Sequence, residues 1–137
     1  MVFSQGCASH NSERMIRDRL NAQAAAWNRC DLEGFMDGYW RSDELVFESV
    51  GKDGESSITR GWQPTLDRYK KRYDTPEKIG RLAFSGLDVK MTGGDSAIVN
   101  GRYEGLQKEA RLTGSFVLDM RRIDGKWYVT RDRTMGD

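Results

Sequence analysis

Hydrophobic residues recur with two different spacings along the chain, and the change between them divides it into a helical half and a strand half. In the first half an apolar stripe with steps of four, four and three is formed by Ile16, Leu20, Ala24 and Trp27. Charged residues occupy the positions between them, which is the pattern of an amphipathic helix with one buried face. We therefore predict a helix over residues 12–29.

Two further helices and a hairpin follow in the sequence. A shorter stripe after the capping residue Asp31 predicts a second helix. Residues 44–60 contain two β-rich segments around a Gly-Lys-Asp-Gly turn, which predicts a hairpin. A third helix is predicted from an aromatic stripe at helical spacing, formed by Trp62, Leu66, Tyr69 and Tyr73.

From residue 79 onward the spacing changes to two, which predicts long antiparallel strands. A shift of the alternation at Ser85-Gly86 predicts a β-bulge. Strict alternation in the last segment places four residues on one face of the closing strand, namely Trp127, Val129, Arg131 and Arg133. Asp132 is then expected to face the opposite way.

The order of these elements predicts an α+β fold in which a strongly curved antiparallel sheet forms a cone around three helices from the N-terminal half. A chain of 137 residues with 37% hydrophobic and 31% charged residues fits one soluble globular domain. We assign residues 12–137 to this domain and expect residues 1–11 to be a disordered leader.

Three segments resemble the nuclear transport factor 2-like superfamily: residues 25–35 (Ala-Ala-Trp-Asn-Arg-Cys-Asp-Leu-Glu-Gly-Phe), residues 59–62 (Thr-Arg-Gly-Trp) and residues 125–129 (Gly-Lys-Trp-Tyr-Val). More narrowly, they look like its small bacterial branch, which is related to SnoaL-like polyketide cyclases and ketosteroid isomerases. The resemblance covers residues 12–134. It implies a cystatin-like roll with a hydrophobic cavity, common homodimerisation through the outer sheet face, and activities that vary among members.

Aromatic residues from every predicted element are candidates to line such a cavity. Tyrosine and tryptophan carry polar groups that seek partners when buried, and a pocket provides them. The residues expected to bind a small molecule are Tyr39, Phe47, Trp62, Tyr69 and Tyr103. A filled aromatic core is the alternative for each of them individually.

Arg131 and Arg133 are predicted to join this site, because a buried guanidinium needs a carboxylate or an anionic ligand. Asp43 and Glu48 are the candidate internal partners. An alternative is that the strand runs past the core and both arginines are solvated. If the protein is an isomerase or cyclase, proton transfer needs a carboxylate base and a hydroxyl donor. The weak candidates for these roles are Asp43, Glu48 and Tyr69.

Other functions find little support in the sequence. His10 is the only histidine and the cysteines Cys7 and Cys30 stand apart, so we expect no metal site and no cofactor. The formal net charge of +1 argues against nucleic acid as a partner. Lys70, Lys71 and Arg72 are accordingly predicted to form a solvated helix face. No apolar run reaches the length of a membrane span.

Two functions from different classes remain open. The first is a homodimeric domain that binds a small, partly apolar or anionic molecule, either as a binding protein or as an enzyme of the isomerase or cyclase type. The alternative is a non-catalytic dimerisation or interaction module that uses the outer sheet face. The sequence as written indicates a cytoplasmic protein with free thiols. If the beginning is a trimmed lipoprotein signal, Cys7 becomes the lipidated residue and the protein is periplasmic or lipid-anchored.

Overall fold

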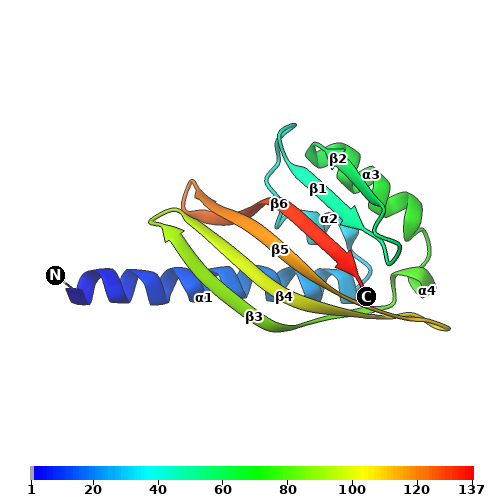
Figure 1. Cartoon of the computed structure of the whole chain (residues 1–137), viewed down its shortest axis with the longest axis horizontal. Helices are drawn as coiled ribbons and strands as arrows, with labels where there is room; N and C mark the ends of the chain where they lie inside the picture. The colour runs from blue at the N-terminus through cyan, green and yellow to red at the C-terminus, as the bar shows by residue number, and fades with distance from the viewer. Residues whose placement is uncertain (1) are drawn as a thin grey trace.

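A computed structural model describes residues 2–137, with side chains described from residue 10 onward. Four helices are present: α1 (Val2–Asn28), α2 (Leu32–Met36), α3 (Trp62–Arg72) and α4 (Pro76–Ile79). Six strands complete the fold: β1 (Val46–Val50), β2 (Ser56–Arg60), β3 (Arg81–Gly93), β4 (Ser96–Leu106), β5 (Arg111–Ile123) and β6 (Lys126–Gly136). Figure 1 shows the long helix α1 crossing beneath the strands, with α2 and α3 near its C-terminal end. The predicted α+β architecture is confirmed.

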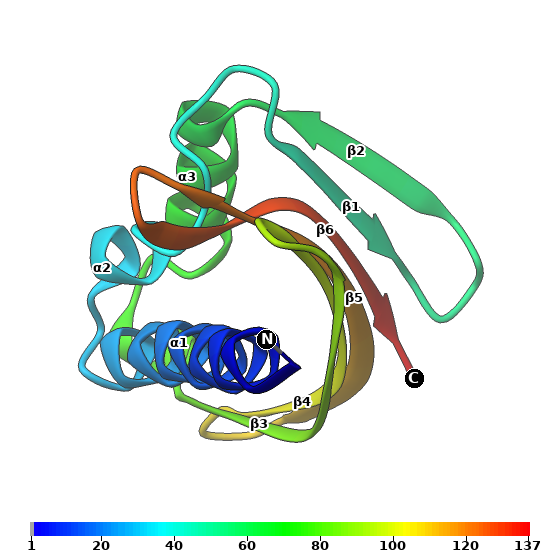
Figure 2. The same cartoon turned by 90° about the vertical axis from the view of Figure 1, so that its left-hand side faces the viewer.

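All six strands belong to one sheet with the order β2-β1-β6-β5-β4-β3. Neighbouring strands pair antiparallel except β1 and β6, which are parallel. The sheet is therefore mixed, whereas the sequence predicted an antiparallel one, because a hairpin that joins the last strand of the chain can pair in either direction. In Figure 2 the strands β3, β4 and β5 curve around α1, which is seen end-on.

Helix α1 is longer than predicted. It begins at Val2 rather than at residue 12, and Met1 lies outside the described residues. The assignment of residues 1–11 to a disordered leader stays a prediction. The helix ends at Asn28. Cys30 follows with a φ of 62°, which lets the Asp31 amide donate back to the Ala26 carbonyl at 2.9 Å. Asp31 then caps α2 by accepting from the Gly34 amide at 2.9 Å, as predicted.

The core lies between the concave face of the sheet and the helices. The apolar stripe of α1 is buried there, as are the predicted inner faces of β4 and β5. The largest fully buried side chains include Ile16, Leu20, Met36, Leu45, Met120 and Trp127. Burial of residues this large excludes water from the closed end of the cone and stabilises each by roughly 1.5–3 kcal/mol.

Two β-bulges interrupt the sheet. One lies between Ser85 and Asp88, with Gly86 at a φ of 58°, and confirms the prediction from the sequence. The other lies in β6, where the pairing steps from Val129 opposite Met120 to Arg131 opposite Asp119 and leaves Thr130 as the extra residue. The alternation along β6 does not predict this second bulge.

The bulge at Thr130 reverses which side chains of β6 face the core. Trp127 and Val129 are buried before it, and Asp132 is buried after it, with 4% of its surface exposed. Arg131 and Arg133 are exposed on the outer face. The prediction that these arginines share the inner face with Trp127 is therefore wrong, because one extra residue shifts the alternation by one position.

Candidate functional site

A cavity of about 420 Å³ lies between the concave face of the sheet and the helices. Its volume falls within the roughly 300–1,000 Å³ of small-molecule pockets. The apolar part of its lining includes Leu20, Trp27, Phe35, Phe84, Phe116 and Leu118. Side chains therefore do not fill the cone. A closed aromatic core, the alternative interpretation of these residues, would have required them to fill it.

Four of the five aromatic residues predicted to bind a ligand line this cavity, namely Tyr39, Phe47, Tyr69 and Tyr103. Trp62 does not line it. Its indole Nε1 donates to the Met36 carbonyl at 2.8 Å, and the Arg41 guanidinium covers its ring at 3.9 Å from the centroid. Trp62 thus joins α3 to α2, and the prediction of a lining role for it is wrong because its polar group found a backbone partner in the core.

Tyr69 stands at the centre of an aromatic cluster. Its ring centroid lies 5.8 Å from that of Trp27, 5.4 Å from Phe35 and 5.6 Å from Phe47. Edge-to-face and tilted contacts of this kind hold each ring in one orientation. The Trp27 indole is fixed further by donating to the Ile79 carbonyl at 2.8 Å. The cluster is a rigid wall that fixes the position of the Tyr69 phenol.

Among the residues described, Asp132 is the one buried carboxylate that lines this aromatic cavity. Its neighbour across the parallel pairing of β1 and β6 is Phe47, so both side chains point to the same side of the sheet. The Tyr39 hydroxyl donates to Oδ2 of Asp132 at 2.7 Å, and the Thr134 hydroxyl donates to Oδ1 at 2.6 Å. Each carboxyl oxygen therefore has a hydrogen-bond donor that holds its orientation.

Burial raises the pKa of Asp132 to about 6, because the apolar surroundings disfavour the charged carboxylate. The hydrogen bonds from Thr134 and Tyr39 act in the opposite direction and lower this pKa. A carboxyl group that titrates near neutral pH can both accept and return a proton, which is the property that general acid-base chemistry needs.

The two tyrosines beside Asp132 are held in the protonated form. Burial is the main cause that raises the pKa of Tyr39 and of Tyr69, and the charge of Asp132 raises both further. The Tyr39 hydroxyl is engaged with Asp132. Tyr69 borders the cavity from α3, and its phenol stays a hydrogen-bond donor at neutral pH.

The carboxylates predicted as bases lie elsewhere. Asp43 is exposed. Glu48 belongs to the outer face of β1, where its Oε1 lies 3.2 Å from Nε of Arg133. Glu48 is therefore the carboxylate partner of Arg133, but this ion pair lies outside the cavity. Arg131 also lies on that outer face.

Asp132 was missed because the alternation of β6 was continued through Thr130. One signal in the sequence could have found it. Strict alternation along β6 would bury the two guanidiniums of Arg131 and Arg133. An offset of one residue buries the single carboxylate of Asp132 instead. The offset costs less desolvation free energy, because one ion is buried rather than two.

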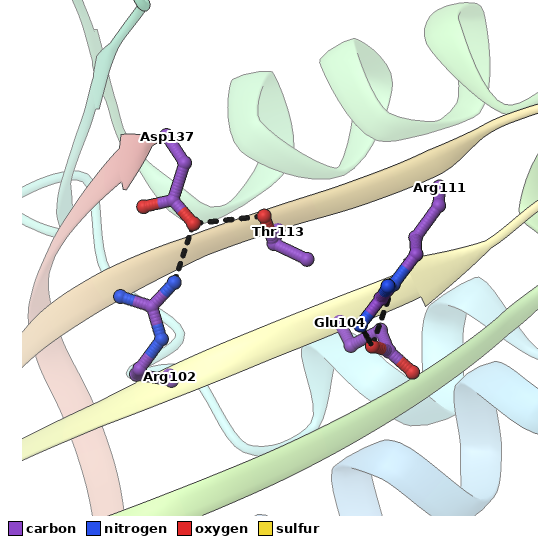
Figure 3. Close-up of polar contacts among 5 residues, drawn as sticks. All are labelled: Arg102, Glu104, Arg111, Thr113 and Asp137. Carbon is purple, nitrogen blue, oxygen red and sulfur yellow. Dashed lines mark hydrogen bonds and ion pairs between the residues drawn. The ribbon is translucent and has the colours of Figure 1, made fainter.

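The mouth of the cavity is polar and rich in cations. Lys52, Arg68, Arg72 and Arg111 contribute to its lining, together with the acidic residue Asp137. Figure 3 shows that Asp137 accepts hydrogen bonds from Arg102 and Thr113, while Arg111 pairs with Glu104. These contacts tie the ends of β4, β5 and β6 together at the open side of the cone.

Within residues 10–137, no group of three or more His, Cys, Asp or Glu side chains is placed to hold a metal ion. None of the helices described is long and apolar enough to cross a membrane. Cys30 is an exposed free thiol. The side chain of Cys7 lies outside the described residues, so its lipidation stays a prediction.

A mixed sheet curved around a long helix, with a cavity at its concave face, is the fold of the cystatin-like and NTF2-like proteins. No protein-family model matches the sequence, and no curated protein matches it. The chain nevertheless belongs to the NTF2-like family, because it is 34% identical to an NTF-2 like protein of unknown function from Shewanella oneidensis MR-1. The two align over 90% of this chain and 98% of the other, with a TM-score of 0.82.

More distant solved structures share the fold. A ketosteroid isomerase-like protein from Erwinia carotovora atroseptica SCRI1043 is 20% identical, with a TM-score of 0.66 over 90% of this chain and 94% of its own. A putative scytalone dehydratase from Novosphingobium aromaticivorans DSM 12444 is 11% identical, with a TM-score of 0.74 over 96% and 88% of the two chains. At these identities the likeness concerns the fold alone.

Proposed function

We propose that this protein binds a small, partly apolar molecule in the cavity and transfers a proton at a carbon next to a carbonyl group. The observation that carries this proposal is the position of Asp132: a buried carboxyl group with a pKa of about 6, inside an aromatic cavity. Two structural neighbours with isomerase-like and dehydratase-like descriptions are compatible with such chemistry.

In this proposal Asp132 is the general base and Tyr69 is the donor to the substrate oxygen. Asp132 removes a proton from the carbon, and the C–H electron pair becomes the enolate π bond while the carbonyl electrons move onto oxygen. The Tyr69 hydroxyl donates a hydrogen bond to that oxygen, which stabilises the developing charge. Asp132 then returns a proton to another carbon of the conjugated system, which makes the net reaction an isomerisation. Where the protonated Asp132 exchanges with solvent first, the returned proton comes from solvent, and in deuterated buffer it is a deuteron.

Tyr39 has a separate role as a positioning residue. Its hydroxyl donates to Asp132, so it orients the carboxylate and offsets part of the rise in pKa that burial causes. A base whose pKa is near the working pH combines a high ionised fraction with sufficient basicity. Thr134 supports the other oxygen in the same way.

The test is proton exchange at ketone substrates. The protein is incubated in deuterated buffer with a panel of cyclic ketones, including 1-tetralone and 3-cyclohexen-1-one, and deuterium uptake is followed by NMR. We expect uptake above the buffer rate for at least one ketone, and conversion of 3-cyclohexen-1-one to its conjugated isomer. Exchange at the buffer rate for the whole panel contradicts the proposed chemistry.

We also propose that the protein forms a homodimer through the outer sheet face, as the family resemblance implies. The outer face of β4 and β5 carries half-buried apolar side chains, Ile98 and Val117, among polar ones, which suits a moderately polar interface. Sedimentation equilibrium tests this, and a monomer across micromolar concentrations contradicts it.

The alternative function, an interaction module without catalysis, also predicts dimerisation but predicts no proton exchange.

A further inference from the structure

Two arginines at the mouth of the cavity have no part in the proposed chemistry. Arg68 and Arg72 are one turn apart on α3, and both line the cavity. Residues four positions apart on a helix lie on the same face, so the two guanidiniums reach the same region. Arg68 is half-buried and Arg72 is exposed, so this region is the open side of the cavity, whereas the floor around Asp132 is buried.

Neither arginine is neutralised by the protein. Among residues 10–137, no carboxylate forms an ion pair with Arg68 or Arg72. Arg68 donates to the hydroxyls of Thr59 and Ser57, both at 3.0 Å, and its guanidinium lies 5.4 Å from the Phe47 ring centroid. These contacts hold the guanidinium in place against the cavity wall and leave its positive charge unbalanced.

The charges of the two arginines act on the tyrosines of the cavity. Arg68 lowers the pKa of Tyr69, and Arg72 lowers the pKa of Tyr103, each opposing the larger effect of burial. Lys52 adds a third cation at the mouth. Asp137 is the acidic residue among these cations, and it is already occupied by Arg102 and Thr113.

The other cations of α3 differ from this pair. Lys70 forms an ion pair with Glu33 at 2.9 Å, and Lys71 is exposed and does not line the cavity. The sequence predicted a common solvated face for Lys70, Lys71 and Arg72. The structure separates Arg72 from that face and places it beside Arg68.

We propose that the molecule bound in the cavity carries an oxyanion, a carboxylate or a phosphate ester, which Arg68 and Arg72 bind at the mouth. The inference rests on the proposed function and specifies its substrate class. The planar guanidinium matches both kinds of oxyanion with paired N–H donors. Repulsion by the Asp132 carboxylate keeps the anionic end at the mouth, which directs the uncharged carbonyl end toward Asp132 and Tyr69.

The experiment compares three probes of one shape: 2-naphthoate, 2-naphthyl phosphate and the neutral 2-naphthamide. Binding to the full chain is measured by calorimetry or by fluorescence titration at low and high salt. The test variants are Arg72→Gln, which breaks no hydrogen bond of the described protein, and the double variant Arg68→Gln/Arg72→Gln. Lys71→Gln on the same helix is the matched control for a general loss of positive charge.

We expect the wild type and Lys71→Gln to bind at least one anionic probe about five- to tenfold more tightly than the amide, since partly exposed charge pairs contribute modestly. The preference should shrink in Arg72→Gln, disappear in the double variant and weaken at high salt, while amide binding stays unchanged. Comparison of the naphthoate with the phosphate identifies the oxyanion.

Equal binding of the amide and both anions overturns this inference and leaves the proposed proton transfer intact. A preference for anions that survives in the double variant overturns it as well. If none of the three probes binds although the protein exchanges ketone protons, the inference of an anion site is also overturned. An arginine-dependent preference without ketone exchange refutes the proposed chemistry and leaves the anion site established.

Discussion

The floor and the mouth of the cavity differ in their charge and in their exposure to water. At the floor, a single carboxyl group is surrounded by aromatic rings, and each of its oxygens accepts one hydroxyl hydrogen bond. At the mouth, several cations are partly solvated, and among the residues described only Arg111 of these cations forms an ion pair. A charged group interacts more strongly with its neighbours at the floor than at the mouth, because water screens electrostatic interactions at the mouth and is excluded from the apolar floor.

The difference predicts where a substitution should affect chemistry and where it should affect binding. In the proposed mechanism, a change at the floor alters the protonation of the group that touches the reacting atoms. A change at the mouth alters affinity for a charged ligand by a modest factor. The predictions below test this contrast, beginning with the largest effect.

Asp132→Asn is expected to reduce ketone proton exchange by about 100-fold or more, because it removes the proposed buried base while preserving the shape of the cavity. The measurement is the NMR exchange rate described above. Asp43→Asn is the matched control, since Asp43 is an exposed aspartate, and it should leave the rate unchanged. Equal rates for the Asp132 variant and the wild type would remove Asp132 from the mechanism.

The raised pKa of Asp132 predicts a pH-dependent stability. In the unfolded chain this group titrates near 3.8, and in the folded protein near 6, so the folded state binds the proton more tightly. Stability from this group is present in full below pH 4 and is lost as the pH rises from about 4 through about 6. The loss is about 3 kcal/mol.

Denaturant unfolding across this pH range measures the effect. In Asp132→Asn the corresponding decrease should be absent, because asparagine does not titrate. Above pH 6 the variant should therefore be as stable as the wild type or more stable, although it is inactive. An unchanged pH dependence in the variant would show that other groups cause it.

Tyr39→Phe removes the hydrogen bond to Oδ2 of Asp132. That bond lowers the pKa of Asp132, so its loss should raise the pKa and move the acidic limb of the rate profile to higher pH. Below the new pKa the exchange rate should fall about 10-fold, while the plateau at high pH should fall less. A uniform decrease with an unshifted limb would argue that Tyr39 acts only on packing.

Glu48→Gln gives the smallest expected effect. It breaks the ion pair with Arg133 on the outer face, where partly exposed pairs contribute up to about 1 kcal/mol. Exchange rates and probe affinities should stay within twofold of the wild type, as measured in the assays above. A large loss of activity would show that the outer and inner faces of β6 are coupled.

Much of the fold could be predicted from the sequence because it depends on repeated local patterns. The stripe through Ile16, Leu20 and Trp27 specifies the buried face of α1, and the alternation through Val99 and Phe116 specifies the inner face of the sheet. The shift at Ser85-Gly86 also leaves a local trace in the alternation. Each of these signals lies within one element.

The candidate site was predicted only in part. Tyr39, Phe47, Tyr69 and Tyr103 follow from element faces, and all four line the cavity. Asp132 depends on the bulge at Thr130, which is a mismatch between β6 and its partner β5 and has no periodic signal of its own. The parallel pairing of β1 with β6 joins distant segments and likewise could not be read from local spacing.

The extra residue at Thr130 has a consequence for comparing this protein with its relatives. In this protein Asp132 lies five positions after Trp127, the last residue of the Gly-Lys-Trp motif. In a strand without the extra residue, the corresponding inward-facing residue would lie four positions after the tryptophan. A gap-free sequence alignment anchored on that motif would therefore match Asp132 with an outward-facing position in such a relative. Catalytic equivalence across the family has to be assigned from superimposed strands, with one residue of offset allowed at this point.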